Sequence, residues 1–252
     1  MSKKAGAPAL SAKVAPKPHK NPAPRPPKAG PPEISRHRAH ESHEPPASSR
    51  TPKIDSPADD SAKAFVPLET GLRRIQLQGL VDAIKPILTH PVRPYTPLIL
   101  DRAGHTDAFF TYASEYGGLF VDAKKFLSQV SIQKTMDLAQ ALEEMRRTLV
   151  SAMKYGKTLV IRMANTAVDF QSKFTGPTTF PTADLLVEGG RRFHEERYWR
   201  SVVRDEDMDT GCFLCRPEFC VVVTTTFAKE DYREYLEKAL PLGEMIPVCI
   251  DE

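Results

Sequence analysis

The residues best placed to do chemistry lie in one short loop, between a predicted buried strand at residues 97–100 and a predicted helix. They are polar or flexible residues: Asp101, Gly104, His105, Thr106 and Asp107. A strand, a glycine-containing loop and a helix, in that order, form the geometry in which α/β proteins bind phosphate groups. A working P-loop also needs several glycines, whose amide groups converge on the phosphates, followed by Lys and Ser or Thr. This loop has one glycine and two acids that would repel a phosphate, so the sequence predicts the shape of a phosphate site without its chemistry.

His105 lies between Asp101 and Asp107 and has the side chain of a general base. No nucleophile and no set of metal ligands accompanies it in the sequence. We therefore expect an exposed loop histidine, and we expect no catalytic residue elsewhere in the chain.

A second phosphate-type motif, Gly156-Lys157-Thr158, has the residues that end a Walker A sequence. A genuine motif follows a strand and opens a helix, whereas this one follows a predicted helix and opens a predicted strand. The motif also requires a glycine where this chain has Ser151. We expect Gly156 to end the helix, with Lys157 favourably placed near its carboxyl end.

Three cysteines, Cys212, Cys215 and Cys220, have a spacing that resembles part of a zinc site. Zinc needs four ligands, and His194 could complete the set only if the charged segment between them folded back. Buried or incidental thiols are the favoured interpretation, so we expect no metal. The acidic residues at 205–209 are likewise interpreted as a solvated turn rather than a cation site.

The N-terminal part of the chain differs in composition from the rest. Fourteen of the 23 prolines fall in the first 67 residues, and residues 1–50 hold ten Lys or Arg against three Glu. Such a segment has too few apolar residues to offset the entropy of ordering it. We predict a disordered, basic, proline-rich tail at residues 1–64 and one compact domain at residues 65–252.

The pattern of apolar residues contains neither a membrane-spanning segment nor a secretory signal. No run of about 18 apolar residues is present, so no membrane-spanning helix is predicted. The N-terminus lacks the apolar core of a secretory signal, and four cysteines without such a signal are typical of a reducing compartment. The sequence therefore predicts a cytoplasmic protein that does not enter a membrane.

Short apolar runs alternate with helical patterns through the rest of the chain. This alternation predicts an α/β fold, with a five-stranded parallel sheet covered by helices on both faces. The predicted strands are residues 97–100, 119–121, 158–161, 219–224 and 246–250. The predicted helices are residues 71–88, 107–116, 132–153, 182–187 and 229–239, with Ser131 capping the third.

Ligands of open parallel sheets bind beyond the carboxyl ends of the strands. This rule places the loop at 101–107 on one rim with polar residues that follow two other strands. Any nucleotide would have to bind there, through Asp101, Gly104, His105, Thr106, Asp107, Asn165 and Thr224.

Several pieces of the sequence occur in an order known from one protein family. They are residues 97–107, 152–161, 189–191, 205–209, 219–225 and 228–234. In this order, the chain from Tyr95 onward resembles the fifth AAA+ module of dynein heavy chains. The resemblance implies a three-layer core of the P-loop NTPase type, with the loop after Leu100 at the P-loop position.

Three departures from the family pattern bear on function. The family has acidic residues at the Walker B position, where this chain has residues 162–165, Arg-Met-Ala-Asn. Residues 211–215 form an insertion. The sequence ends soon after the fifth predicted strand, where an AAA+ module continues into a helical lid, so we expect a core that lacks this lid.

These departures remove the groups that phosphoryl transfer uses: the P-loop Lys, the Ser or Thr that follows it, the acid on the third strand and the lid arginine. Loss of a single charge-stabilising group costs about 3 kcal/mol of barrier. We therefore expect no ATPase activity and no cofactor, and a structural or protein-interaction role instead. By analogy with dynein alone, the partners would be cytoskeletal or axonemal proteins, with microtubules reached by the basic tail, in the cytoplasm, cytoskeleton, cilium or flagellum.

Two alternatives stay open. The first is a nucleotide-binding switch or weak NTPase that binds ATP through the rim residues without a standard P-loop. The second is a nucleic-acid binder that uses the tail. The tail lacks aromatic residues to stack on bases, so such binding would be independent of sequence and strongly dependent on salt, and nucleic acid is not the expected partner.

Overall fold

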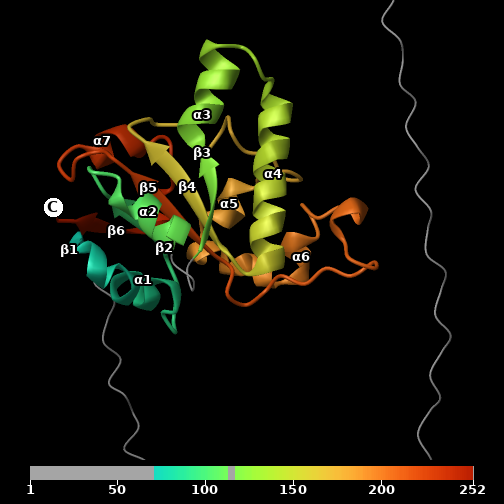
Figure 1. Cartoon of the computed structure of the whole chain (residues 1–252), viewed down its shortest axis with the longest axis horizontal. Coiled ribbons are helices and arrows are strands. Elements are labelled where there is room, and N and C mark those ends of the chain that lie inside the picture. Colours follow the sequence, from blue (N-terminus) through green and yellow to red (C-terminus); the bar gives the residue numbers. More distant parts are fainter. Residues whose placement is uncertain (1–70, 113–116, 252) are drawn as a thin grey trace, which may run out of the picture. The chain divides into compact units, whose positions relative to one another are not determined.

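A parallel sheet of six strands forms the centre of the structure (Figure 1). The computed structural model describes residues 71–112 and 117–251, and the predicted tail at residues 1–64 lies outside these ranges. The predicted α/β class is confirmed, but the sheet has six strands rather than five. The strands are β1 (Arg73–Ile75), β2 (Thr96–Leu100), β3 (Gly118–Asp122), β4 (Thr158–Ala164), β5 (Cys220–Thr225) and β6 (Met245–Ile250).

The strands follow the order β1-β6-β2-β5-β4-β3 across the sheet, and every neighbouring pair is parallel. Every residue of β2, β5 and the first four positions of β4 is buried. These strands are nearly continuous apolar runs because helices or connecting segments cover them on both faces.

The strand at the outer edge, β1, corrects the prediction of one helix over residues 71–88. Arg73–Ile75 pairs with β6, and the amide of Asp251 extends this ladder by donating to the carbonyl oxygen of Ile75 at 2.8 Å. The helix begins only at Leu80. The apolar spacing that suggested a helix at Ile75 equally fits a short strand, and the pairing with β6 decides between them because it satisfies the backbone groups of both segments.

Seven α-helices lie among the described residues, joined by short 3₁₀ and π-type turns. None of them is long and apolar enough to cross a membrane. The helices are α1 (Leu80–Leu88), α2 (His105–Tyr112), α3 (Ala123–Leu127), α4 (Leu138–Tyr155), α5 (Thr182–Leu185), α6 (Glu196–Trp199) and α7 (Tyr232–Leu236). The short turns are η1 (Leu77–Gly79), η2 (Ser128–Ile132), η3 (Glu188–His194), η4 (Asp205–Asp207) and η5 (Leu242–Glu244).

The two faces of the sheet carry different helices. On one face α1 and α2 contribute Leu80 and Phe110 to a core that includes Ile99. On the other face α4 and α7 share a larger core, in which Met145 and Leu100 are both buried. The connections that follow the neighbouring strands β2 and β5 therefore leave on opposite faces, through α2 and α7. Their carboxyl ends form the topological switch point, where ligands of such sheets bind.

The long helix α4 begins later than its apolar pattern predicted. The expected cap, Ser131, lies in η2, and Ile132 is 74% exposed. The helix is capped by Asp137 instead, through a capping box in which Asp137 and Gln140 each accept from the other's backbone amide. Its predicted end is confirmed, because Gly156 forms the C-cap in the left-handed conformation at φ 62°.

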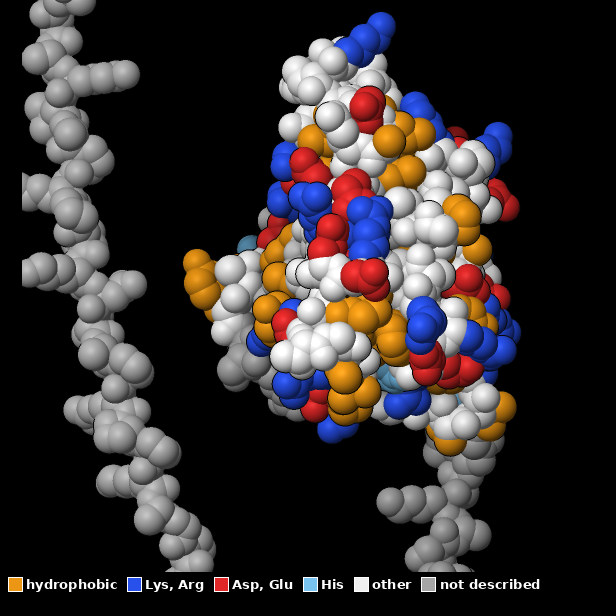
Figure 2. All heavy atoms as spheres, turned by 90° about the vertical axis from the view of Figure 1, so that its right-hand side faces the viewer, with side chains coloured by type: hydrophobic (Ala, Val, Ile, Leu, Met, Phe, Trp, Pro, Cys, Tyr) orange, Lys and Arg blue, Asp and Glu red, His pale blue; other side chains and the backbone are white. Residues whose placement is uncertain are grey.

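A buried arginine on α4 holds the long connection between β4 and β5. Arg146 is completely buried and donates to the carbonyl oxygen of Val202 at 2.8 Å and to the carboxylate of Asp207 at 2.5 Å. Glu143 accepts from Arg146 at 3.0 Å and also from Arg204. A buried charge is costly unless its donors are satisfied, and here the guanidinium has acceptors from two elements. Around α4 and α6, Figure 2 shows acidic and basic side chains interleaved on the surface.

Two consecutive glycines bring this same connection against the sheet. Gly189 and Gly190 have φ values of 61° and 81°. A Cβ on Gly189 would lie 2.5 Å from Leu88, and one on Gly190 would lie 2.5 Å from Val221. The amide of Gly189 donates to the buried hydroxyl of Thr96. The positive φ and the close approach both require glycine here.

Candidate functional site

The loop after β2 is organised by a carboxylate from its own chain. Asp101 is 2% exposed, and its amide donates to the carbonyl oxygen of Thr225 at 2.9 Å, which fixes it between the two central strands. Its side chain accepts two further hydrogen bonds, from the amide of Gly104 at 2.9 Å and from the amide of Thr106 at 2.6 Å. The loop is therefore closed around Asp101.

These two amides are the donors that an anion would use at this position. Gly104 has a φ of 77°, which turns its amide inward, and Thr106 lies in the first turn of α2. The start of a helix favours negative charge because its first amides lack partners and its dipole is positive there. Asp101 already supplies that negative charge, so both donors are satisfied inside the protein.

A cavity of about 270 Å³ lies beside this loop, at the switch point between β2 and β5. The structure thus brings together Asp101, Gly104, Thr106, Asp107 and Thr224. Arg162 and Ala164 of β4 and the residues that follow Thr224 complete the lining.

Two of the predicted rim residues do not line this cavity. Asn165 is exposed and accepts a hydrogen bond from Nζ of Lys124 at 2.9 Å. His105 is the first residue of α2, and its side chain is exposed to solvent. The exposure expected for His105 is confirmed, but the residue starts α2 instead of lying in the loop, and the side chain of Asn165 is paired with Lys124.

Arg162 is the functional-site residue whose role the sequence did not indicate. Its Nε lies 2.9 Å from Oδ2 of Asp107, and its Nη1 lies 3.5 Å from Oδ2 of Asp122. Asp122 also caps α3 by accepting from the amide of Lys125 at 2.9 Å. Arg162 therefore ties together α2, the end of β3 and its own strand. Its replacement of an acid was visible in the sequence, but its two partners depend on strand order.

The charge balance of this cavity is reflected in the pKa of Asp107. Partial burial is the largest influence and raises the pKa of this carboxyl, and Asp101 and Asp122 raise it further. Arg162 opposes them and lowers it, and the net pKa is above the ordinary value. A phosphate would enter a cavity lined by two carboxylates, Asp101 and Asp107, against the one guanidinium of Arg162.

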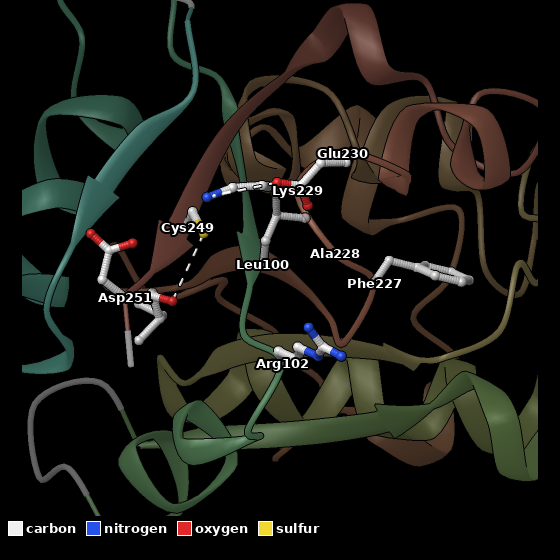
Figure 3. A pocket seen from close by; sticks show the side chains of 9 residues that line it. Leu100, Arg102, Phe227, Ala228, Lys229, Glu230, Cys249 and Asp251 are labelled. Carbon is white, nitrogen blue, oxygen red and sulfur yellow. Dashed lines mark hydrogen bonds and ion pairs between the residues drawn. The ribbon is translucent and has the colours of Figure 1, made fainter.

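A second hollow, of about 290 Å³, lies on the same rim at the ends of β2 and β6 (Figure 3). Its walls include Arg102, Lys229 and Cys249, together with the loop that precedes α7. Burial raises the pKa of the Cys249 thiol, which donates to the carbonyl oxygen of Ile250. The sequence did not indicate this hollow, because its residues come from three separate segments.

The cysteines that suggested zinc lie in different surroundings. Cys212 is exposed, whereas Cys215 and Cys220 are buried, and burial raises the pKa of Cys215 to about 12. His194 is within hydrogen-bond distance of the carbonyl oxygen of Phe219, at 3.1 Å. Within residues 71–112 and 117–251, no three His, Cys, Asp or Glu side chains are grouped so that they could hold a metal ion.

The acidic residues at 205–209 form a turn, as expected, but not a purely solvated one. Asp207 has a side chain that is only 15% exposed and pairs with the buried Arg146. Asp209 is exposed and pairs with Lys154 at 2.8 Å. The turn is therefore anchored to α4 by ion pairs, which the sequence pattern could not show.

No family model, curated protein or solved structure matches this chain.

Replacement of Asp101 by Asn is expected to destabilise the fold by about 1–3 kcal/mol, because the amide group of Asn cannot accept at both positions and leaves one buried N–H without a partner. Urea unfolding measures this change. The control is Asp82→Asn, at an exposed position of α1, which should alter the free energy of unfolding by less than about 0.5 kcal/mol. Equal stabilities of the two variants would contradict the assigned role of Asp101.

Replacement of Arg162 by Gln is expected to raise the pKa of Asp107 further, because the one influence that lowers it is removed. A carboxyl with a raised folded pKa binds its proton more tightly in the folded state, so its contribution to stability falls as pH rises. The variant should lose up to about 1 kcal/mol at neutral pH, since the pair is partly exposed, and this loss should shrink on acidification as Asp107 becomes protonated.

Carbon-13 NMR titration of Asp107, with urea unfolding at neutral and acidic pH, measures both effects. Arg147→Gln removes an exposed arginine that pairs with Glu143, and it should leave the titration of Asp107 unchanged. An unaltered Asp107 titration in Arg162→Gln would show that the two residues are not coupled.

Proposed function

We propose that this chain contains a non-catalytic AAA+-like domain that serves as a structural or protein-interaction module. The observation that carries the proposal is the internal carboxylate of Asp101, which occupies the two amides that would otherwise hold a phosphate. An inward-facing acid of the chain itself replaces the anion, so the loop keeps its conformation without a ligand.

The arrangement of the sheet supports this proposal. The loop at 101–107 follows a central strand and opens a helix at the switch point, and the strand order is consistent with a P-loop-like α/β core. This agrees with the implied likeness to a dynein AAA+ module, in which the loop would stand at the P-loop position.

The side chains around the loop argue against phosphoryl transfer. Arg162 lies on β4 where the dynein likeness implies a catalytic acid, and it is paired with Asp107 and Asp122. The loop has His105 where a P-loop has its lysine, and the amide of Thr106, at the hydroxyl position, is already bonded to Asp101. Each missing electrostatic group costs about 3 kcal/mol of barrier, so the domain has no efficient route to hydrolysis.

The proposed partners are cytoskeletal or axonemal proteins, with the basic segment at residues 1–50 directed at an acidic surface such as that of microtubules. The corresponding location is the cytoplasm, at the cytoskeleton, cilium or flagellum. These proposals rest on the charge of the segment and on the likeness to dynein.

Titration of the full chain with Mg-ATP up to millimolar concentration is expected to give no binding heat in a calorimeter, because the loop donors are already satisfied. The alternative is a nucleotide-binding switch or weak NTPase. Micromolar affinity that is lost in Asp107→Ala, a variant at the cavity wall, would support that alternative and contradict the proposal. A chain with Asp82→Ala serves as the control for non-specific effects of charge.

Co-sedimentation with microtubules is expected for the full chain and is expected to be lost from a chain that starts at Ala64. A second variant keeps the length and replaces the Lys and Arg of residues 1–50 by Gln, which separates charge from length. Retained sedimentation in both variants would remove the basic segment from the proposed function. Equally tight binding to unrelated single-stranded DNA, with a steep salt dependence, would favour the nucleic-acid alternative.

A further inference from the structure

One end of the sheet is only partly covered on the face that carries α4 and α7. The side chains of β6 alternate, so that Ile246 and Val248 pack beneath α1 on one face. Met245, Pro247 and Cys249 belong to the opposite face, where each borders a hollow rather than a packed helix. The only α-helix that follows β5 in the described chain is α7, which has five residues.

The hollow bordered by Met245 and Pro247 is here called the apolar hollow. Its volume is about 400 Å³, within the range of small-ligand and anchor pockets. Leu98 and Met245 form part of its lining and are almost completely buried, and the ring of Tyr232 adds an aromatic wall. Arg233 lines it and donates from Nε to the hydroxyl of Tyr232 at 3.0 Å. A large apolar side chain with a nearby negative charge fits this lining.

The second hollow is the one in Figure 3, here called the rim hollow. Lys229 and Arg102 lie on opposite sides of it in that view. Arg102 is exposed and has no acidic side chain within 4.0 Å among the described residues, whereas Lys229 lies 3.7 Å from Glu230. A carboxylate placed between Arg102 and Lys229 would gain two cationic donors.

The charges along this strip favour an acidic partner. The two hollows are lined by Arg102, Lys229 and Arg233 against Glu230 and Asp251. These three cations against two acids leave the lining of the two hollows with a net charge of +1. The exposed acids Glu234 of α7 and Glu237, which follows that helix, line neither hollow.

The spacing of the hollows defines the shape of the partner. Met245 borders the apolar hollow and Cys249 borders the rim hollow, and four residues of a strand span about 13 Å. We propose that this strip of β6 is a docking surface for an acidic segment of a partner protein, which places one large apolar side chain in the apolar hollow and a carboxylate about 13 Å away in the rim hollow. This inference rests on the proposed protein-interaction function and names its surface and the chemistry of its partner.

Buried anchors carry most of the affinity of such contacts, so filling the apolar hollow should prevent binding. Gly243 lines that hollow, and a Cβ added there meets no atom within 4 Å and needs no positive φ. Gly243→Trp therefore blocks the hollow without straining the backbone. Gly71→Trp is its matched control, because Gly71 also has open space around it.

Charge reversal tests the rim hollow separately. Arg102→Glu replaces the unpaired cation, and Arg197→Glu on α6 reverses a comparably exposed arginine away from β6. All four variants keep the basic segment at residues 1–50, so its attraction for acidic peptides cancels in the comparison. Thermal unfolding confirms that each variant is folded.

The probe is a fluorescently labelled acidic peptide in which one tryptophan and a glutamate are separated by about four positions, which matches the spacing of the hollows in an extended chain. Fluorescence anisotropy with the full chain should show saturable binding. Gly243→Trp and Arg102→Glu should each weaken it about tenfold or more, while Gly71→Trp and Arg197→Glu stay within about twofold. A peptide with serine in place of tryptophan should bind as weakly as Gly243→Trp binds the original.

Equal affinities for Gly243→Trp and Gly71→Trp would overturn the proposal, as would displacement of the peptide by an equimolar thymidine oligonucleotide, which would show charge attraction alone. Neither result bears on the proposed function. That proposal is contradicted by Mg-ATP binding, which the peptide experiment does not measure. Mg-ATP binding with intact peptide discrimination would overturn the non-catalytic assignment and leave the docking strip in place.

Discussion

The carboxylate of Asp101 is the constraint on which the functional edge of the sheet depends. It lies at the end of the central strand β2, its backbone pairs with β5, and its side chain closes the loop that opens α2. A buried carboxylate is stable only when its oxygens accept hydrogen bonds, and a helix start with free amides supplies them. The same two bonds give partners to the two loop amides. The conformation of the loop and the satisfaction of its two amides therefore have one physical cause.

A second internal charge plays a comparable structural role on the other side of the molecule. Arg146 on α4 is buried and gathers acceptors from its own helix and from the long connection between β4 and β5. Arg162 does the same at the rim, where it joins three elements through Asp107 and Asp122. In each case a charged side chain holds segments from different elements in place.

Much of the fold could be read from the sequence because its signals are local. Apolar runs located five of the six strands, and Gly156 ended α4 because its left-handed conformation is one that glycine adopts readily. Two predicted helix starts were wrong because in each case the apolar pattern continues beyond the helix itself. β1 is too short for its pattern to exclude a helix, and α4 starts at the Asp137 capping box although apolar residues continue upstream to Ile132. At the site, the loop and Thr224 were brought together as expected, whereas Asn165 was drawn away by Lys124.

The sequence by itself determined the class of fold, the edge on which the strands end and the lack of a P-loop lysine after β2. These follow from residue types and from the rule that parallel strands end on one edge. Only the tertiary structure decided which charges meet. The bonds from Asp101 to its loop amides, the partners of Arg162 and Arg146, and the two hollows beside β6 join residues whose distance in space depends on strand order and on loop conformation. Electrostatic and packing contacts act over a few ångströms, so a sequence that names the charged residues does not say which of them come within that range.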